Sequence, residues 1–139
     1  MIKKSITYTN YNDGSELTED FFFNLSKAEI MEMEMSTSGG LAERIQRITA
    51  AQDAPEIIKI FKELILKAYG EKSGDGKRFM KEDENGRPLS DKFKETEAYS
   101  ILFMELATDA DKASEFVNGI IPADMTKEVA KAAKHPAVK

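Results

Sequence analysis

The chain of 139 residues contains no cysteine and no tryptophan, and it has a single histidine. The absence of cysteine excludes disulfides, thiolate metal ligands and cysteine nucleophiles. The one histidine, His135, precedes Pro136 in a lysine-rich stretch that offers no neighbours to orient it for catalysis. We therefore expect neither a structural zinc site nor a histidine-based active site.

Long apolar runs are also missing. Uninterrupted apolar stretches are only a few residues long, whereas a membrane-spanning helix needs about 20. The first ten residues carry two lysines but lack the apolar run of a secretory signal. We expect a cytoplasmic protein that contacts no membrane.

Charge is plentiful and unevenly distributed. Charged residues make up 32% of the chain, apolar residues make up 41%, and the net charge is −5. Residues 126–139 contain four lysines and one glutamate, a charge of +3, so the rest of the chain carries −8. An acidic body argues against nucleic acid as a partner. The length suits one domain; we expect a single α+β domain over residues 1–125 and a basic tail over 126–139.

The first 25 residues have the pattern of a β-hairpin. Apolar and polar side chains alternate along 2–8 and 17–23, and Asp13-Gly14 between them is a turn signal. The alternation puts Phe22 on the polar face of its strand. Because a lone hairpin is marginal in water, this one must pack on helices or pair with another chain.

Helical signals follow the hairpin. Ser26 and Glu29 form a capping box, which predicts a helix to about Met35. Capping residues and apolar spacing predict further helices at residues 41–52, 53–69, 90–107, 109–119 and 125–134. The predicted class is α+β, mainly α: a hairpin at 2–25 followed by a compact bundle of about five helices over 26–125.

Residues 70–90 differ from their surroundings. Their glycines and many charges predict an exposed charged loop, with a short strand at Arg78–Met80 as its ordered centre. A calcium-binding loop over 81–92 would have its glycine in place, but lysine would stand at its first and last positions, where ligands are needed. Residues 74–77 lack the spacing of a phosphate-binding loop. We expect no metal, no cofactor and no small-molecule substrate.

No arrangement of residues predicts catalysis. Carboxylate pairs such as Asp109 and Asp111 are explained by the preference of helix N-termini for negative charge. Neither a nucleophile elbow nor a dinucleotide-binding fingerprint occurs. We expect a protein that is not an enzyme.

Apolar side chains exceed what one helix face needs. On the first predicted helix, Met31 and Met35 share one side, while Ile30 and Met33 lie about 100° or more away. One stripe can belong to the core, and the other must face another element or a partner. Methionine suits surfaces that adapt to varied partners. We expect Met33, together with Phe22, to face a partner; the alternative is a broad core stripe beneath the hairpin.

The predicted helices at 53–69 and 90–107 show the same excess. One apolar residue of the first lies outside its apolar arc, and apolar side chains of the second point in nearly every direction, as in a central helix or an interface helix. The candidate partner-binding residues are therefore Phe22, Ile30, Met31, Met33, Met35, Leu66, Tyr99 and Leu102.

Three segments in order carry a resemblance to a known family. They are SITYTNYNDGSELTEDFFFNLSKAEI (5–30), SGGLAERIQRITAAQDAPEIIKIFKELILKAYGEKS (38–73) and TEAYSILFMELATDADKASEFVNGIIPADM (96–125). From Ile2 to Met125 the chain resembles the tail assembly chaperones of long-tailed phages and prophages of Gram-positive bacteria. The resemblance rests on sequence texture and element order, because this family has no short diagnostic motif.

The resemblance implies an assembly factor of the host cytoplasm that is absent from the mature virion. Such a protein binds the long helical tape measure protein, keeps it soluble and helps recruit tail tube protein around it. Self-association is also expected, because the edge of a hairpin can add strands between subunits. Two alternatives are a small tail-completion or head–tail protein retained in the virion, and a regulatory adaptor that acts on a host protein.

Overall fold

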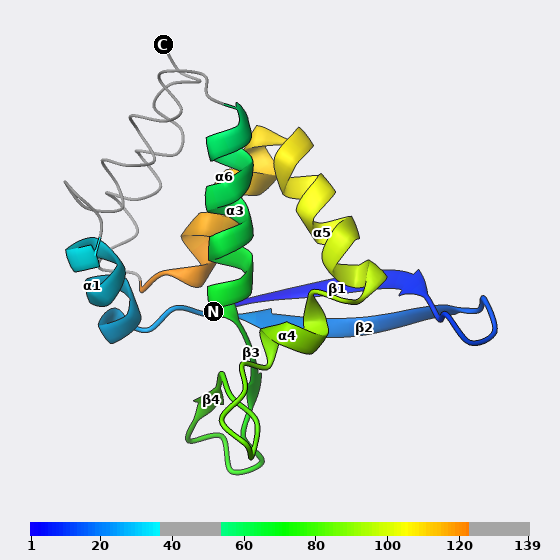
Figure 1. Cartoon of the computed structure of the whole chain (residues 1–139), viewed down its shortest axis with the longest axis horizontal. Helices are drawn as coiled ribbons and strands as arrows, with labels where there is room; N and C mark the ends of the chain where they lie inside the picture. The colour runs from blue at the N-terminus through cyan, green and yellow to red at the C-terminus, as the bar shows by residue number, and fades with distance from the viewer. Residues whose placement is uncertain (37–53, 123–139) are drawn as a thin grey trace.

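The computed structural model describes residues 1–36 and 54–122, which form an α+β fold with a four-stranded antiparallel sheet and five helices (Figure 1). The predicted α+β class is confirmed, but the fold is not mainly α: the sheet has four strands instead of the two of the predicted hairpin, and about half of the described residues are helical. In chain order the elements are β1 (Ile2–Thr9), β2 (Glu16–Phe23), α1 (Lys27–Ser36), α3 (Ala54–Ala68), β3 (Tyr69–Lys72), β4 (Phe79–Met80), α4 (Ser90–Phe93), α5 (Glu97–Thr108) and α6 (Ala110–Ile120). The predicted helices at 41–52 and 125–134 and the basic tail lie outside the described residues.

The predicted hairpin is confirmed. Strands β1 and β2 pair along their full length, and Gly14 in the turn has a φ of 73°, which glycine adopts without strain. One face of the hairpin is polar, with the hydroxyls of Thr7 and Thr18 2.8 Å apart across the strands. The other face places Ile6 and Phe23 in the core. The hairpin therefore packs on the helices through one face, and its turn projects beyond them in Figure 1.

The sheet extends beyond the hairpin, which corrects the prediction of an exposed loop over 70–90. Strand β3 pairs with the end of β2, with Gly70 opposite Phe22, and β4 pairs with β3. A Cβ on Gly70 would lie 2.6 Å from the carbonyl oxygen of Met80, so only glycine allows this approach. The short strand predicted within this segment is confirmed as β4. The connections on either side of it remain exposed.

The helix predicted over 90–107 is divided in two, which is a second correction. Helix α4 ends at Phe93 and α5 begins at Glu97, with Thr96 between them. The Thr96 hydroxyl donates to the carbonyl oxygen of Phe93 at 2.7 Å and accepts from the backbone N–H of Tyr99 at 3.2 Å. One side chain thus satisfies the end of α4 and the start of α5, which makes the break stable without glycine or proline.

Helix α1 is held against α3 by the side chain of Lys81. The capping box is confirmed, with Ser26 Oγ accepting from the backbone N–H of Glu29 at 3.1 Å. Lys81 Nζ lies 2.7 Å from Glu29 Oε2, and it also donates to the carbonyl oxygen of Lys67 at 2.7 Å. A residue near β4 therefore joins the start of α1 to the end of α3. This contact is compatible only with the rotation of α1 that also buries Ile30 and Met33.

The hydrophobic core lies between the sheet and helices α3, α5 and α6. Helix α5 runs across β1, where Lys4 Nζ lies 2.9 Å from Glu105 Oε1. Asp109 caps α6 as predicted, accepting from two backbone N–H groups of its first turn. The largest fully buried side chains are Phe23, Leu25, Ile30, Leu64, Ile65, Leu102, Leu106, Phe116, Val117 and Ile120.

The contact between α6 and β1 predicts the effect of a substitution. A Cβ on Gly119 would lie 2.7 Å from Cβ of Ile2, so Gly119→Ala should destabilise the fold by about 1–3 kcal/mol despite its gain in helix propensity. The free energy of unfolding in urea measures this. Gly74→Ala is the matched control, since no atom lies within 4 Å of a Cβ there. If Gly119→Ala destabilises the fold equally when Ile2 is also replaced by glycine, the steric explanation is wrong.

The contact between Glu29 and Lys81 predicts a dependence on pH. Partial burial raises the pKa of Glu29, but hydrogen bonds from Lys81 and from the Ser26 backbone outweigh it and hold the pKa below its ordinary value. A carboxyl whose pKa is lowered by folding stabilises the fold above its unfolded pKa, here about 4.3, and loses that contribution as the pH falls through the folded pKa. Glu29→Gln should therefore reduce stability at neutral pH, and the difference from wild type should vanish in acid.

Chemical denaturation across this pH range measures both proteins. Glu32→Gln, an exposed glutamate of the same helix, is the matched control and should change stability by less than about 0.5 kcal/mol. A difference between Glu29→Gln and wild type that persists unchanged in acid would show that the ionised carboxylate is not the stabilising form.

Candidate partner-binding groove

The acidic loops beside β4 use their carboxylates to close their own turns. Asp83 Oδ1 accepts from the backbone N–H of Arg87 at 3.0 Å, and Asp75 Oδ1 accepts from the Ser73 hydroxyl at 2.7 Å and the backbone N–H of Lys77 at 3.0 Å. These hydrogen bonds hold the pKa of both carboxyls below the usual range. Within residues 1–36 and 54–122, no group of three or more acidic or histidine side chains could hold a metal ion.

A cluster of aromatic rings connects the sheet to α5. The ring of Phe93 stacks on that of Tyr69 with centroids 4.2 Å apart, and it contacts the rings of Phe21, Phe23 and Tyr99 at 5.3 to 5.8 Å. Burial in this cluster raises the pKa of Tyr69 to about 12, so its hydroxyl stays protonated. Helix α5 therefore begins against a rigid aromatic support contributed by β2, β3 and α4.

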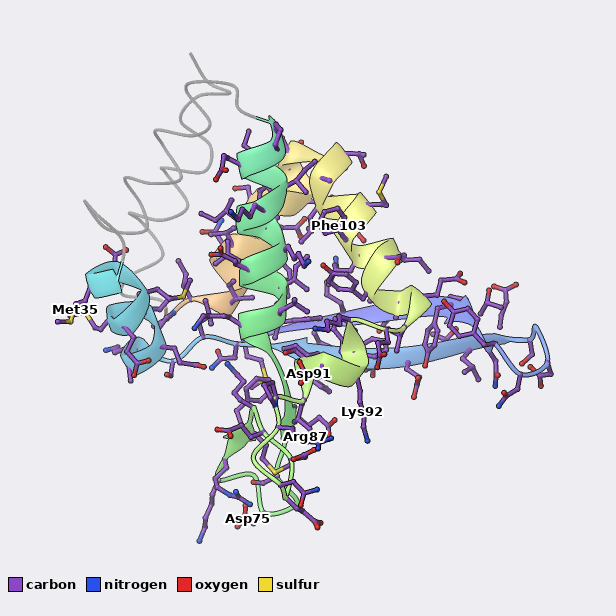
Figure 2. The ribbon with its side chains drawn as sticks, in the orientation of Figure 1. Met35, Asp75, Arg87, Asp91, Lys92 and Phe103 are labelled. Carbon is purple, nitrogen blue, oxygen red and sulfur yellow. The ribbon has the colours of Figure 1, made fainter. Side chains whose placement is uncertain are left out.

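The same aromatic chain continues to the surface as the floor of a groove between α3 and α5. The rings of Tyr99 and Phe103 are 6.0 Å apart, and both are half-buried. Figure 2 labels Phe103 between the two helices. The groove encloses about 480 Å³ and is lined by Ile58, Lys62, Lys94, Tyr99, Ser100, Phe103 and Met104. Ile58 and Met104 are 44% and 56% exposed, which leaves apolar surface open to solvent on both sides.

The charges that line this groove are positive, whereas the chain as a whole carries −5. Lys62 comes from α3, and Lys94 comes from the turn before α5; among residues 1–36 and 54–122, no carboxylate lines the groove. Lys94 Nζ lies 3.8 Å from Asp91 Oδ1, but both side chains are about half exposed, so this pair contributes little. Burial raises the pKa of Tyr99, which keeps the floor neutral. The groove therefore suits an apolar segment flanked by negative charge.

A second hollow, of about 380 Å³, lies where the hairpin turn approaches the α4–α5 junction. Its lining combines apolar surface from Tyr8, Tyr11 and Leu17 with charges of both signs from Lys92, Glu95 and Glu97. The Thr9 hydroxyl donates to Glu97 across it at 3.3 Å. Charges of both signs and an internal hydrogen bond make this hollow a weaker candidate than the groove.

The predicted partner-binding residues do not form one surface. Tyr99 lies in the groove, whereas Met31 and Met35 are 52% and 82% exposed on α1. Figure 2 shows Met35 on the other side of α3 from Phe103. Leu66 is half-buried against the core. Phe22 is half-buried on the outer face of the sheet, where Lys72 Nζ lies 4.2 Å from the centre of its ring.

The other three predicted residues are buried, and the structure corrects the expectation that they are accessible. Ile30 and Leu102 are fully buried, and Met33 is 7% exposed. Ile30 and Met33 face the core, on the side of α1 that also lets Glu29 reach Lys81, so the outward stripe of α1 is Met31 and Met35. Leu102 belongs to the buried line of α5 that faces β1 and α3.

Sequence reasoning missed most of the groove. Ile58 and Lys62 are four residues apart on α3, and Tyr99 and Phe103 have the same spacing on α5. Such pairs lie on one helix face, so each row could be found from the sequence. That the two rows face each other depends on how α3 and α5 pack, and that packing has no local signal.

No helix in the described parts of the chain is long and apolar enough to cross a bilayer. A search of the curated proteins and a search of the solved structures found no match to the chain. A family model described as "Phage tail assembly chaperone" matches residues 1–139, the full length, and confirms the resemblance seen in the sequence. The chain therefore belongs to the phage tail assembly chaperones, a non-enzymatic family.

Proposed function

We propose that this tail assembly chaperone binds the tape measure protein in the groove between α3 and α5. Bound there, the tape measure protein stays soluble in the host cytoplasm, and the complex helps to recruit tail tube protein around it. The chaperone then leaves before the virion matures. The observation that carries the proposal is an open apolar groove on the surface of a member of this family.

The shape of the groove suits a helix. Two rows of side chains spaced four residues apart, one from α3 and one from α5, leave between them the space that a third helix fills in helix-in-groove recognition. A long helical protein with an apolar stripe presents such a segment many times along its length. A chaperone that covers one segment per copy would keep the whole stripe out of water.

The side chains of the groove combine a fixed floor with adaptable walls. Tyr99 is held by Phe93 beneath it, whereas Met104 and the two lysines are long and exposed. Flexible methionine and lysine side chains can repack around segments of different sequence. This combination supports binding to many similar but non-identical stretches of one partner.

The net charge of −5 supports the same function. Copies of an acidic chaperone that coat a partner repel neighbouring complexes, which opposes aggregation while the apolar stripe is covered. The positive charge gathered at the groove orients the chaperone, because it directs the groove rather than the acidic surface toward the partner.

Co-expression with the tape measure protein tests this proposal. Ile58→Asp combined with Met104→Asp places negative charge in the groove. Because both positions are exposed, each substitution should change the free energy of unfolding by less than about 0.5 kcal/mol. The variant should lose roughly tenfold or more in affinity and leave the tape measure protein in the insoluble fraction. Solubility and co-purification are measured, with thermal melting of the chaperone alone as the check on folding.

The matched control is Ile101→Asp, an exposed apolar residue of α5 that does not line the groove. It should solubilise the tape measure protein as wild type does. If the groove variant performs equally well, the groove is not the binding site. Mass spectrometry of purified virions decides the role: finding the chain there would favour a structural tail-completion protein over a chaperone.

A further inference from the structure

Helix α1 presents a second apolar surface that the groove does not include. Met31 and Met35 are four residues apart, so they form one ridge, with Glu32 exposed on one side of it. The helix carries three glutamates and one lysine. Because Ile30 and Met33 anchor its other side in the core, the ridge is held facing solvent. We define the methionine ridge as Met31, Glu32 and Met35.

The methionine ridge and the groove are complementary in charge and in form. Among the described residues the groove is lined by two lysines and no carboxylate, whereas the exposed carboxylate of Glu32 stands beside the methionines of the ridge. Anchors spaced four residues apart on one helix are what a groove between two helices accepts. The groove volume of about 480 Å³ leaves room for two methionine side chains.

One copy of the chain cannot make this contact with itself. The ridge and the groove lie on opposite sides of α3, with Met35 and Phe103 far apart in Figure 2. We propose that the methionine ridge of one copy docks into the α3–α5 groove of a second copy. The second copy covers the groove until the tape measure protein displaces it. This regulatory role of the contact rests on the proposed function.

The contact joins two different surfaces, so the association is head to tail. Each copy in a pair still has one unused ridge and one unused groove, and further copies can add at both ends. A ridge of two methionines is a small interface, so the association should be weak and should depend on concentration. We expect a series of oligomers in rapid exchange rather than a single stable dimer.

Sedimentation or light scattering of the chain alone tests the proposal. The average mass of wild type should rise with concentration, and Met31→Ser combined with Met35→Ser should reduce association roughly tenfold or more. Tyr11→Ser, which removes an exposed aromatic ring from the hairpin turn, is the matched control and should leave association unchanged. A wild type that stays monomeric, or a ridge variant that associates normally, would overturn the proposal.

Mixing two variants tests whether the contact is head to tail. The ridge variant keeps an intact groove, and the Ile58→Asp, Met104→Asp variant keeps an intact ridge. Each should be monomeric alone, and the mixture should form a one-to-one heterodimer that does not grow further. No heterodimer would overturn the proposal. A charge exchange adds a check on register: Lys62→Glu should weaken association, and Glu32→Lys in the same chain should restore it.

The two proposals fail in different ways. The ridge variant should still solubilise the tape measure protein, because its groove is intact, whereas the groove variant should lose both activities. If the ridge variant still associates and the groove variant loses only tape-measure binding, the self-association proposal is wrong and the proposed function stands. If the groove variant stays monomeric but still solubilises the tape measure protein, the proposed function is wrong and the self-association proposal stands.

Discussion

The packing of the Phe93 ring joins the sheet to the helices that carry the groove. This ring stacks on Tyr69 of β3 and contacts rings from β2 and α5, so one residue of a four-residue helix connects three elements. The Thr96 cap starts α5 directly after it, which fixes the direction in which α5 leaves the cluster. Because Tyr99 rests on Phe93, the floor of the groove is an extension of the core. Its rigidity comes from the core, and its adaptability comes from the exposed side chains along its edges.

Local signals predicted the elements whose cause is local. The hairpin follows from alternation around Asp13-Gly14, and the start of α1 follows from its capping box. Strand β3 forms because it pairs with β2, where Gly70 lies opposite Phe22. These two residues are far apart in the sequence, so no local pattern predicts the strand. The break before α5 was missed because threonine is an ordinary helix residue, and only its two hydrogen bonds to neighbouring turns mark it as a boundary.

The candidate partner-binding surface shows more clearly that local patterns do not predict long-range packing. The sequence indicated that α1 has two apolar stripes and that only one can be core, but it favoured Met33 for the outward side. The choice depends on the rotation of the helix, which follows from tertiary contacts: Ile30 and Met33 pack in the core, and Glu29 meets Lys81 across 52 positions of sequence. Similarly, the excess of apolar residues on α5 was visible, but the line containing Leu102 is core and the row containing Phe103 is surface because of how α5 lies on β1 and α3.

If, as proposed, the ridge of one copy covers the groove of another, the two surfaces impose opposite demands on binding strength. Covering the groove with a second copy limits the apolar surface exposed before the partner arrives, but it also lowers the apparent affinity for the partner in proportion to the fraction of grooves that are free. Tight self-association would therefore defeat the chaperone. Two methionines provide a contact small enough to yield to a long partner helix, which can fill the groove of many copies at once and gains from that multivalency. The flexible, acidic ridge thus satisfies both demands better than a larger apolar surface would.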